Sequence, residues 1–198
     1  MHEAGFTHCD IKPDNVCFNS VSRRTVCLID FGSSLSTGDT KSSYVQARWY
    51  RAPEVMLGIP WNSQIDMWSL GCLICELRLG QPVFRGSSVA EVLAAQQAVL
   101  GMHPLSLMNA TDADLRRVYF SGDRLYAIDP TGQPPGRYEL RPQPVRLTSL
   151  LGTEDEGFLD FVSRLLEYTP SLRMSAVEAL EHPWMESRSG GLPGMEVA

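Results

Sequence analysis

The chain has 198 residues, 43% of them hydrophobic and 20% charged, a composition that predicts one sizeable soluble domain with a packed core. Seventeen basic and 23 acidic side chains give a net charge of −6, which argues against a nucleic-acid partner, because phosphate binding needs an excess of Lys and Arg. The sequence has no run of about 18 apolar residues, so we expect no membrane span.

The cysteines are five in number and scattered, at positions 9, 17, 27, 72 and 75. The opening residues, MHEAGFTHCD, lack the basic-then-apolar pattern of a secretory signal, so we expect a reducing, intracellular setting. No basic cluster is long enough to choose between cytoplasm and nucleus. Cys72 and Cys75 lie in an apolar helical pattern with no second pair to complete a zinc site, which places them in the core.

The first third of the chain predicts a strand, an exposed loop and a short helix, in that order. Residues 25–32, TVCLIDFG, form a β-branched run that ends in a glycine turn and predict the strand. Residues 33–44 are rich in Ser, Thr and Gly without periodicity, which indicates the loop. A proline near each end of residues 51–62 limits any helix there to a few residues.

Helices dominate the expectation for the following segments. Residues 63–80 are apolar nearly all round, which is typical of a helix buried on most faces. Ser88 with Glu91, and Ser175 with Glu178, have the spacing of a capping box and each predict the start of a further helix.

The C-terminal half adds a hairpin, an irregular stretch and one strongly amphipathic helix. Residues 118–128 predict a hairpin over Ser-Gly-Asp, and residues 129–144 are a Pro- and Gly-rich excursion. Residues 156–168 predict the amphipathic helix, whereas residues 187–198 have little to bury and predict a flexible tail. The predicted fold class is therefore mainly α, with a small β component (α+β).

Three short motifs then occur in a meaningful order. Residues 8–15, HCDIKPDN, fit the kinase catalytic-loop pattern H-R-D-L-x-x-x-N, except that Cys9 replaces Arg and Ile replaces Leu. Asp-Phe-Gly follows at 30–32, and Ala-Pro-Glu at 52–54 after a loop of 19 residues. One tripeptide alone is weak evidence, but three in this order are strong, and the chain resembles the C-terminal lobe of a eukaryotic protein kinase.

The resemblance implies a role for each polar residue of these motifs. Asp10 is expected to orient the substrate hydroxyl and accept its proton, and Lys12 to meet the charge that develops on the γ-phosphate of ATP. Asn15 and Asp30 are expected to bind Mg²⁺ through oxygen, the ligand atom that this cation prefers. Cys17 takes the position beneath the adenine ring, and a place in the buried core is a second interpretation that does not exclude the first.

Other matching positions imply structural roles. His8 and Phe31 resemble members of the apolar stack that runs through active kinases. Asp66 lies at the start of a buried helix, where an unpaired carboxylate is costly, and its counterpart in the family accepts hydrogen bonds from the catalytic-loop backbone. Glu54 and Arg173 match the ion pair that ties the Ala-Pro-Glu segment to the late helices.

The segment YVQARWYRAPEVMLG, residues 44–58, points to the CMGC branch of cyclin-dependent, mitogen-activated and dual-specificity tyrosine-regulated kinases. Cys9, the DFGSS motif and the 19-residue loop favour the dual-specificity tyrosine-regulated family. The resemblance covers residues 1–186, a partial kinase domain, and is looser through the irregular excursion at 102–157. It implies a serine/threonine, or dual-specificity, kinase that transfers the γ-phosphate of ATP to protein substrates.

Regulation is expected in the loop before the Ala-Pro-Glu segment. Tyr44, if phosphorylated, would pair with Arg48 and Arg51, whose guanidinium groups suit phosphate. An exposed aromatic that packs on the loop is the alternative for Tyr44. Arg51 also resembles the residue associated with a proline-directed substrate preference.

Two departures from the family pattern qualify this expectation. Ala47 stands where the family carries Ser or Thr, whose hydroxyl contacts the catalytic Asp and Lys. The sequence also has no G-x-G-x-x-G motif, and neither Lys12 nor Lys41 can be the strand lysine of the N-terminal β-lobe, which is missing here. We therefore expect a C-lobe fragment of a complete kinase, whose partner is the missing N-lobe. The alternative is a non-catalytic interaction module, a pseudokinase-like half-domain with a partner surface.

Overall fold

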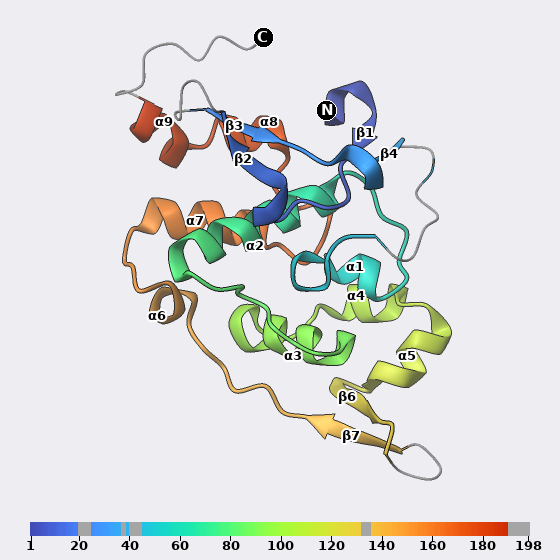
Figure 1. Ribbon diagram of the computed structural model, residues 1–198. Helices are drawn as coiled ribbons and strands as arrows, with labels where there is room; N and C mark the ends of the chain where they lie inside the picture. The colour runs from blue at the N-terminus through green and yellow to red at the C-terminus, as the bar shows by residue number, and fades with distance from the viewer. Residues whose placement is uncertain (20–24, 37–38, 40–44, 132–135, 190–198) are drawn as a thin grey trace.

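The computed structural model describes residues 1–19, 25–36, 39, 45–131 and 136–189, with side chains described as far as residue 186. These residues form a mainly helical fold in which strands are confined to three small sheets (Figure 1). In this part of the chain, no helix is both long and apolar enough to cross a membrane.

The helix α2 (Gln64–Leu79) runs through the middle of the fold, and most other elements surround it (Figure 1). Its apolar composition predicted burial on most faces, and Trp68, for example, is fully buried. The helix α7 (Glu156–Leu165) packs along it. Gly71 permits this close approach, because a Cβ atom at that position would lie 2.8 Å from Cδ2 of Leu166.

The other helices of the described residues frame this central pair, and all of them are shorter than α2. The remaining α-helices of the described residues are α1 (Pro53–Met56), α3 (Val89–Leu100), α4 (Leu105–Ala110), α5 (Ala113–Tyr119), α6 (Leu147–Leu151), α8 (Ala176–Leu180) and α9 (Pro183–Ser189). Single 3₁₀ turns are η1 (His2–Ala4), η2 (Pro13–Asn15), η3 (Phe31–Ser33) and η4 (Arg48–Tyr50). The sequence did not predict α4, α5, α6 or α9, since five to seven residues are too few to display a helical period. Residues 187–189 of the predicted tail belong to α9, and the rest of that tail lies outside the described residues.

The two predicted capping boxes differ in the structure. Ser175 and Glu178 form the complete box, in which each side chain accepts from the backbone N–H of the other residue. At α3 only half of it forms, because the hydroxyl of Ser88 accepts from the N–H of Glu91. The carboxylate of Glu91 accepts instead from the N–H of Ser87, one residue earlier. Both helices nevertheless start where the sequence predicted.

All described sheets are antiparallel. They pair β1 (Phe6–Thr7) with β4 (Leu35–Ser36), β2 (Val16–Phe18) with β3 (Val26–Leu28), and β5 (Phe120–Ser121) with β6 (Arg124–Asp129), which also pairs with β7 (Gly136–Leu140). The predicted hairpin is confirmed as β5–β6. The prediction of a Pro- and Gly-rich excursion at 129–144 was wrong at 136–140, where β7 forms. The sequence did not indicate this strand, because most of β7 is exposed on both faces and so shows no apolar alternation.

A buried histidine joins α3 to the elements that follow it. His103 is 2% exposed, and its ring packs against Tyr168 at 4.7 Å between centroids. Its Nδ1 lies 2.9 Å from Nε2 of Gln97, a donor, so Nδ1 accepts and the proton of the neutral ring is on Nε2, facing Oε1 of Gln96 at 3.5 Å. Burial lowers the pKa of His103 to about 4.

This buried imidazole predicts that acid weakens the fold. Between pH 6.5 and 4 the unfolded chain binds a proton at His103 that the folded chain does not. The free energy of unfolding should therefore decrease as the pH is lowered, by about 3 kcal/mol at the acid end of this range. Urea unfolding of the chain and of His103→Gln at pH 7 and pH 4 measures the effect. Equal losses of stability in the two proteins would contradict the assignment.

Candidate active site

The backbone of the His8-Cys9-Asp10 turn is held by a carboxylate from the central helix. Cys9 has a left-handed backbone, with φ of 66°, which is rare for a residue with a side chain. Asp66, in the first turn of α2, is 1% exposed and accepts from the N–H groups of His8 at 2.7 Å and of Cys9 at 2.9 Å. Nε2 of His2 is a third partner, 2.8 Å from Oδ2 of Asp66. The structure therefore brings Asp66 to the backbone that the sequence predicted it would contact.

The side chain of Cys9 points into the core and is fully buried. Burial, and next the negative charge of Asp66, raise the pKa of its thiol to about 12. The thiol is therefore protonated at neutral pH, and its Sγ donates to the carbonyl of Thr7 at 3.6 Å.

His8 links this turn to the Asp-Phe-Gly segment. The backbone N–H of Asp10, two residues further along the chain, donates to Nδ1 of His8 at 3.3 Å. The ring proton is therefore on Nε2, which lies 3.1 Å from the carbonyl oxygen of Ile29. The ring of Phe31 meets the imidazole edge to face, with 5.1 Å between centroids. His8 is fully buried, whereas Phe31 is 54% exposed. The two side chains are thus in contact, and their membership of the apolar stack of active kinases stays a prediction.

Asp10, Lys12 and Asn15 form one hydrogen-bonded group. Nζ of Lys12 lies 2.7 Å from Oδ2 of Asp10, and the amide nitrogen of Asn15 donates to that same oxygen at 3.0 Å and to the Asp10 carbonyl at 2.8 Å. The hydrogen bond with Asp10 is the main cause that raises the pKa of Lys12. The side chain of Asp10 is 16% exposed, so its carboxylate is oriented yet accessible.

Asp30 begins the turn η3 with a left-handed φ of 61°. Its Oδ1 accepts from the N–H of Gly32 at 3.3 Å, and a Cβ atom on Gly32 would crowd that oxygen at 3.2 Å, so glycine suits the position. The carboxylate is exposed.

The donor set of Asn15 and Asp30 fits a magnesium ion. Asn15 uses its amide nitrogen on Asp10, and no donor among the described residues bonds its amide oxygen. An amide oxygen and an exposed carboxylate are hard ligands, and Mg²⁺ commonly takes one or two protein ligands together with substrate phosphates. The described residues contain no group of three His, Cys, Asp or Glu side chains that could hold a metal by themselves.

A hollow of about 450 Å³ opens beside this group. Asp10, Lys12 and Gly32 line it together with Gln46 and Ala47 from the segment before η4. Ala47 therefore lines the same hollow as Asp10 and Lys12, and a contact between these two residues and a hydroxyl at position 47 stays a prediction.

The wall that carries Ala47 depends on a residue to which the sequence analysis gave no role. Gln46 has a left-handed φ of 69°, and its buried amide donates to the Ile65 carbonyl at 2.8 Å and accepts from the N–H of Ala52 at 3.0 Å. The guanidinium of Arg51 donates to the carbonyls of Val45 at 2.8 Å and Gln46 at 2.7 Å. The amide of Gln46 can satisfy several backbone groups at once, but the segment YVQARWYRAPEVMLG does not reveal which groups these are, because folding brings them close.

Of the three residues in the regulatory prediction, the structure describes the two arginines, Arg48 and Arg51. Tyr44 lies outside the described residues. Arg48 donates to the carbonyl of Ser87 at 2.6 Å and is exposed, whereas Arg51 is 8% exposed and faces backbone carbonyls. Pairing of these two arginines with a phosphate on Tyr44 stays a prediction.

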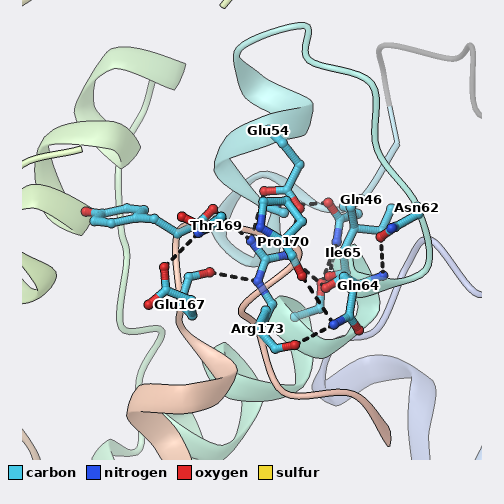
Figure 2. Close-up of polar contacts among 12 residues, drawn as sticks. Gln46, Glu54, Asn62, Gln64, Ile65, Glu167, Thr169, Pro170 and Arg173 are labelled. Atoms are coloured by element: carbon cyan, nitrogen blue, oxygen red, sulfur yellow. Dashed lines mark hydrogen bonds and ion pairs between the residues drawn. The ribbon is translucent and has the colours of Figure 1, made fainter. Parts of the chain in front are cut away.

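Glu54 and Arg173 form a fully buried, bidentate ion pair, with N–O distances of 2.6 and 3.0 Å (Figure 2). Arg173 also donates to the carbonyls of Glu167 at 2.8 Å and Gln64 at 2.9 Å. Its guanidinium lies 5.1 Å from the ring centroid of Trp68. The pair therefore ties α1 and α2 to the segment before α8.

Cys17 lies in β2 and is exposed. The alternative of a buried-core role for Cys17 is therefore wrong, because β2 pairs only with the short strand β3 in the described residues and no layer covers this thiol. The predicted core positions of Cys72 and Cys75 are confirmed.

Comparison with known proteins agrees with this geometry. Residues 1–185 match the family described as Protein kinase domain, and the chain belongs to this family. Its fold is protein-kinase-like and mainly α, as predicted.

Its relatives include dual specificity tyrosine-phosphorylation-regulated kinase 4 of Homo sapiens, 40% identical over 178 residues, which are 90% of this chain and 33% of the relative. Dual specificity tyrosine-phosphorylation-regulated kinase 2 of Drosophila melanogaster is 37% identical over 187 residues, which are 94% of this chain and 25% of the relative. Kinase 3 from Homo sapiens is 35% identical over 205 residues, 93% of this chain and 34% of the relative. The predicted resemblance to this group is confirmed, and the chain spans a quarter to about a third of the length of these relatives.

Removing the carboxylate of Asp66 should cost about 3 to 5 kcal/mol, because Asp66→Ala leaves the buried N–H groups of His8 and Cys9 without their acceptor. Asp66→Asn keeps one acceptor oxygen and should lose less. Urea unfolding of both variants measures the difference. Asp155→Ala removes an exposed helix cap on α7 and serves as the control, with a cost of about 1 kcal/mol. A loss at Asp66→Ala no larger than this control would contradict the role.

The buried ion pair predicts a non-additive double substitution. Arg173→Met strands the Glu54 carboxylate in the core and should cost about 3 to 5 kcal/mol. Adding Glu54→Leu removes the stranded charge and should recover at least about 1 kcal/mol. Arg164→Ala breaks an exposed pair with Asp160 and should cost under about 1 kcal/mol. Denaturant midpoints measure all of these, and a double variant less stable than Arg173→Met alone would refute the prediction.

Proposed function

We propose that the protein is a serine/threonine, or dual-specificity, protein kinase that transfers the γ-phosphate of ATP to protein side chains. The observation that carries this proposal is the group of Asp10, Lys12 and Asn15, joined by hydrogen bonds of 2.7 to 3.0 Å on a backbone held by Asp66. Phosphoryl transfer needs positioning and charge neutralisation more than covalent chemistry, and this group offers both.

In the proposed reaction, Asp10 accepts a hydrogen bond from the substrate hydroxyl and takes its proton as the oxygen attacks the γ-phosphorus. The bond between that phosphorus and the bridging oxygen of ADP breaks, and ADP leaves. Lys12, already beside Asp10, places its ammonium against the charge on the transferred group. Asn15 and Asp30 would hold Mg²⁺, which neutralises phosphate charge when it is bound. Cys17 is proposed to lie beneath the adenine ring.

The chain corresponds to the C-terminal lobe in this proposal, residues 1–186 forming a partial kinase domain. A glycine-rich loop and a strand lysine, which belong to the N-terminal lobe, are then supplied by other residues. Phosphorylation of Tyr44 and a proline-directed preference through Arg51 are proposed as features of the same enzyme, which acts in the cytoplasm or nucleus.

A second function, a non-catalytic interaction module, is favoured by one observation. An apolar groove of about 650 Å³ lies between α2, α7, α8 and α9, and its lining includes Met67, Leu70 and Trp184. Leu77 and Leu180 at this groove are 75% and 60% exposed. Exposed apolar area of this kind is typical of surfaces that another polypeptide covers.

Substitution of Asp10 by Asn should lower phosphate transfer by about 10² to 10⁴-fold, because the amide cannot accept the proton. The loss is measured as transfer of labelled γ-phosphate from ATP to a Ser- or Thr-containing peptide, with the longest protein that the gene encodes as the enzyme. A circular dichroism spectrum equal to that of the unsubstituted protein controls for folding. Absence of transfer by the unsubstituted protein would favour the interaction module instead.

Ala47→Thr should raise the rate about fivefold, since a hydroxyl restored in the hollow beside Asp10 and Lys12 adds about one hydrogen bond to their geometry. Ala47→Val has nearly the same shape without the hydroxyl and should not raise the rate. The same peptide assay measures both. A Thr variant that is unchanged, slower, or equal to the Val variant would refute this role for position 47.

A further inference from the structure

Two cysteines face each other across the hairpin of β2 and β3. Cys17 is the direct partner of Cys27 in the antiparallel register. Two residues away on either side, the N–H of Ile29 donates to Asn15 at 2.9 Å and the N–H of Asn19 donates to Thr25 at 2.8 Å. Hydrogen-bonded and non-hydrogen-bonded pairs alternate along such a ladder, so Cys17 and Cys27 form a hydrogen-bonded pair.

This register puts the two thiols within reach of each other. The Cα atoms of a hydrogen-bonded antiparallel pair are about 5.5 Å apart. Disulfides most often bridge Cα separations of about 4.4 to 6.8 Å. Directly opposed residues also project to the same face of a sheet. The Cβ atoms of a hydrogen-bonded pair are about 5.5 Å apart, wider than the roughly 3.5 to 4.5 Å of a relaxed disulfide, so the bond must draw the two strands slightly together and is easily reduced.

Exposure separates this pair from the other cysteines of the chain. Cys17 and Cys27 are both free and exposed, whereas Cys9, Cys72 and Cys75 are buried. Burial raises the pKa of each of these three thiols, which keeps them protonated. Reaction with oxidants needs an accessible thiolate, so the exposed pair is where oxidation should occur.

We propose that Cys17 and Cys27 form a reversible modification site, a cross-strand disulfide made by exchange with glutathione disulfide. One protein thiolate attacks glutathione disulfide, forms a mixed disulfide and releases one glutathione. The second protein thiolate attacks the protein sulfur of that mixed disulfide and releases the other glutathione. Two protein thiols are oxidised and one glutathione disulfide is reduced to two glutathione molecules, and excess glutathione reverses the exchange.

The disulfide joins the two strands that carry the candidate magnesium ligands. Asn15 immediately precedes β2, and Asp30 follows β3 by two residues. A covalent bond between the strands fixes these flanking residues relative to each other and changes the surface at Cys17. The effect on nucleotide binding rests on the proposed function, whereas formation of the disulfide does not.

The test treats the 198-residue chain with glutathione disulfide under native conditions, blocks remaining thiols by alkylation and digests it with trypsin. Arg23 and Arg24 lie between the two cysteines, so the disulfide joins peptide 1–23 to peptide 25–41. Tandem mass spectrometry then assigns the bond in the first peptide to Cys17 or to Cys9. We expect the Cys17–Cys27 product to exceed any other cysteine pairing by about tenfold, and to disappear after reduction.

Cys17→Ser and Cys27→Ser are matched variants, each of which should lose the joined peptide and carry glutathione on the remaining thiol. Slow alkylation of Cys72 and Cys75 in the same sample shows that the chain is folded. Glutathione on both exposed cysteines without a joined peptide, or a bond at Cys9, would overturn the proposal. So would covalent dimers as the main product on a non-reducing gel.

Discussion

The hydrogen bonds of the Asp66 carboxylate to the backbone of His8 and Cys9 are the interaction on which the candidate site depends. A carboxylate that is 1% exposed would be strongly destabilising without donors, and it has two backbone N–H groups and His2. Its place in the first turn of α2 adds the favourable field of a helix N-terminus. In return, the carboxylate holds Cys9 in a left-handed conformation. That conformation sets the directions in which the flanking side chains of His8 and Asp10 leave the backbone.

The same helix organises the rest of the site. The hydroxyl of Ser69, one turn after Asp66, accepts from the amide of Gln46 and donates to the carbonyl of Tyr50, which fixes the segment around Ala47. The first carbonyl of the helix, that of Gln64, accepts from Arg173. The His8-Cys9-Asp10 turn, the segment around Ala47 and the Glu54–Arg173 ion pair are therefore all anchored to one helix. Displacement of α2 would disturb all three together.

The parts of the site that the sequence predicted are those in which the residue type already specifies the chemistry. The spacing of the three motifs was enough to expect Asp10, Lys12 and Asn15 together, and the buried position of Asp66 indicated its need for donors. The role of Gln46 could not be predicted, because it depends on carbonyl and amide groups brought close only by folding. The strand β7 was missed for a related reason, since cross-strand hydrogen bonds hold it in place of a buried apolar face. Where a bond to distant backbone decides the conformation, local pattern carries little information.

The ion pair between Glu54 and Arg173 joins residues that are 119 positions apart. Closing so long a loop costs chain entropy before any contact compensates for it, whereas short helices such as α3 and α7 need only local contacts. We therefore expect the pair to form late in folding, after its surrounding helices. Interactions made after the transition state slow unfolding and leave the folding rate nearly unchanged. On that expectation, this buried pair mainly lengthens the lifetime of the folded chain and has little influence on its folding rate.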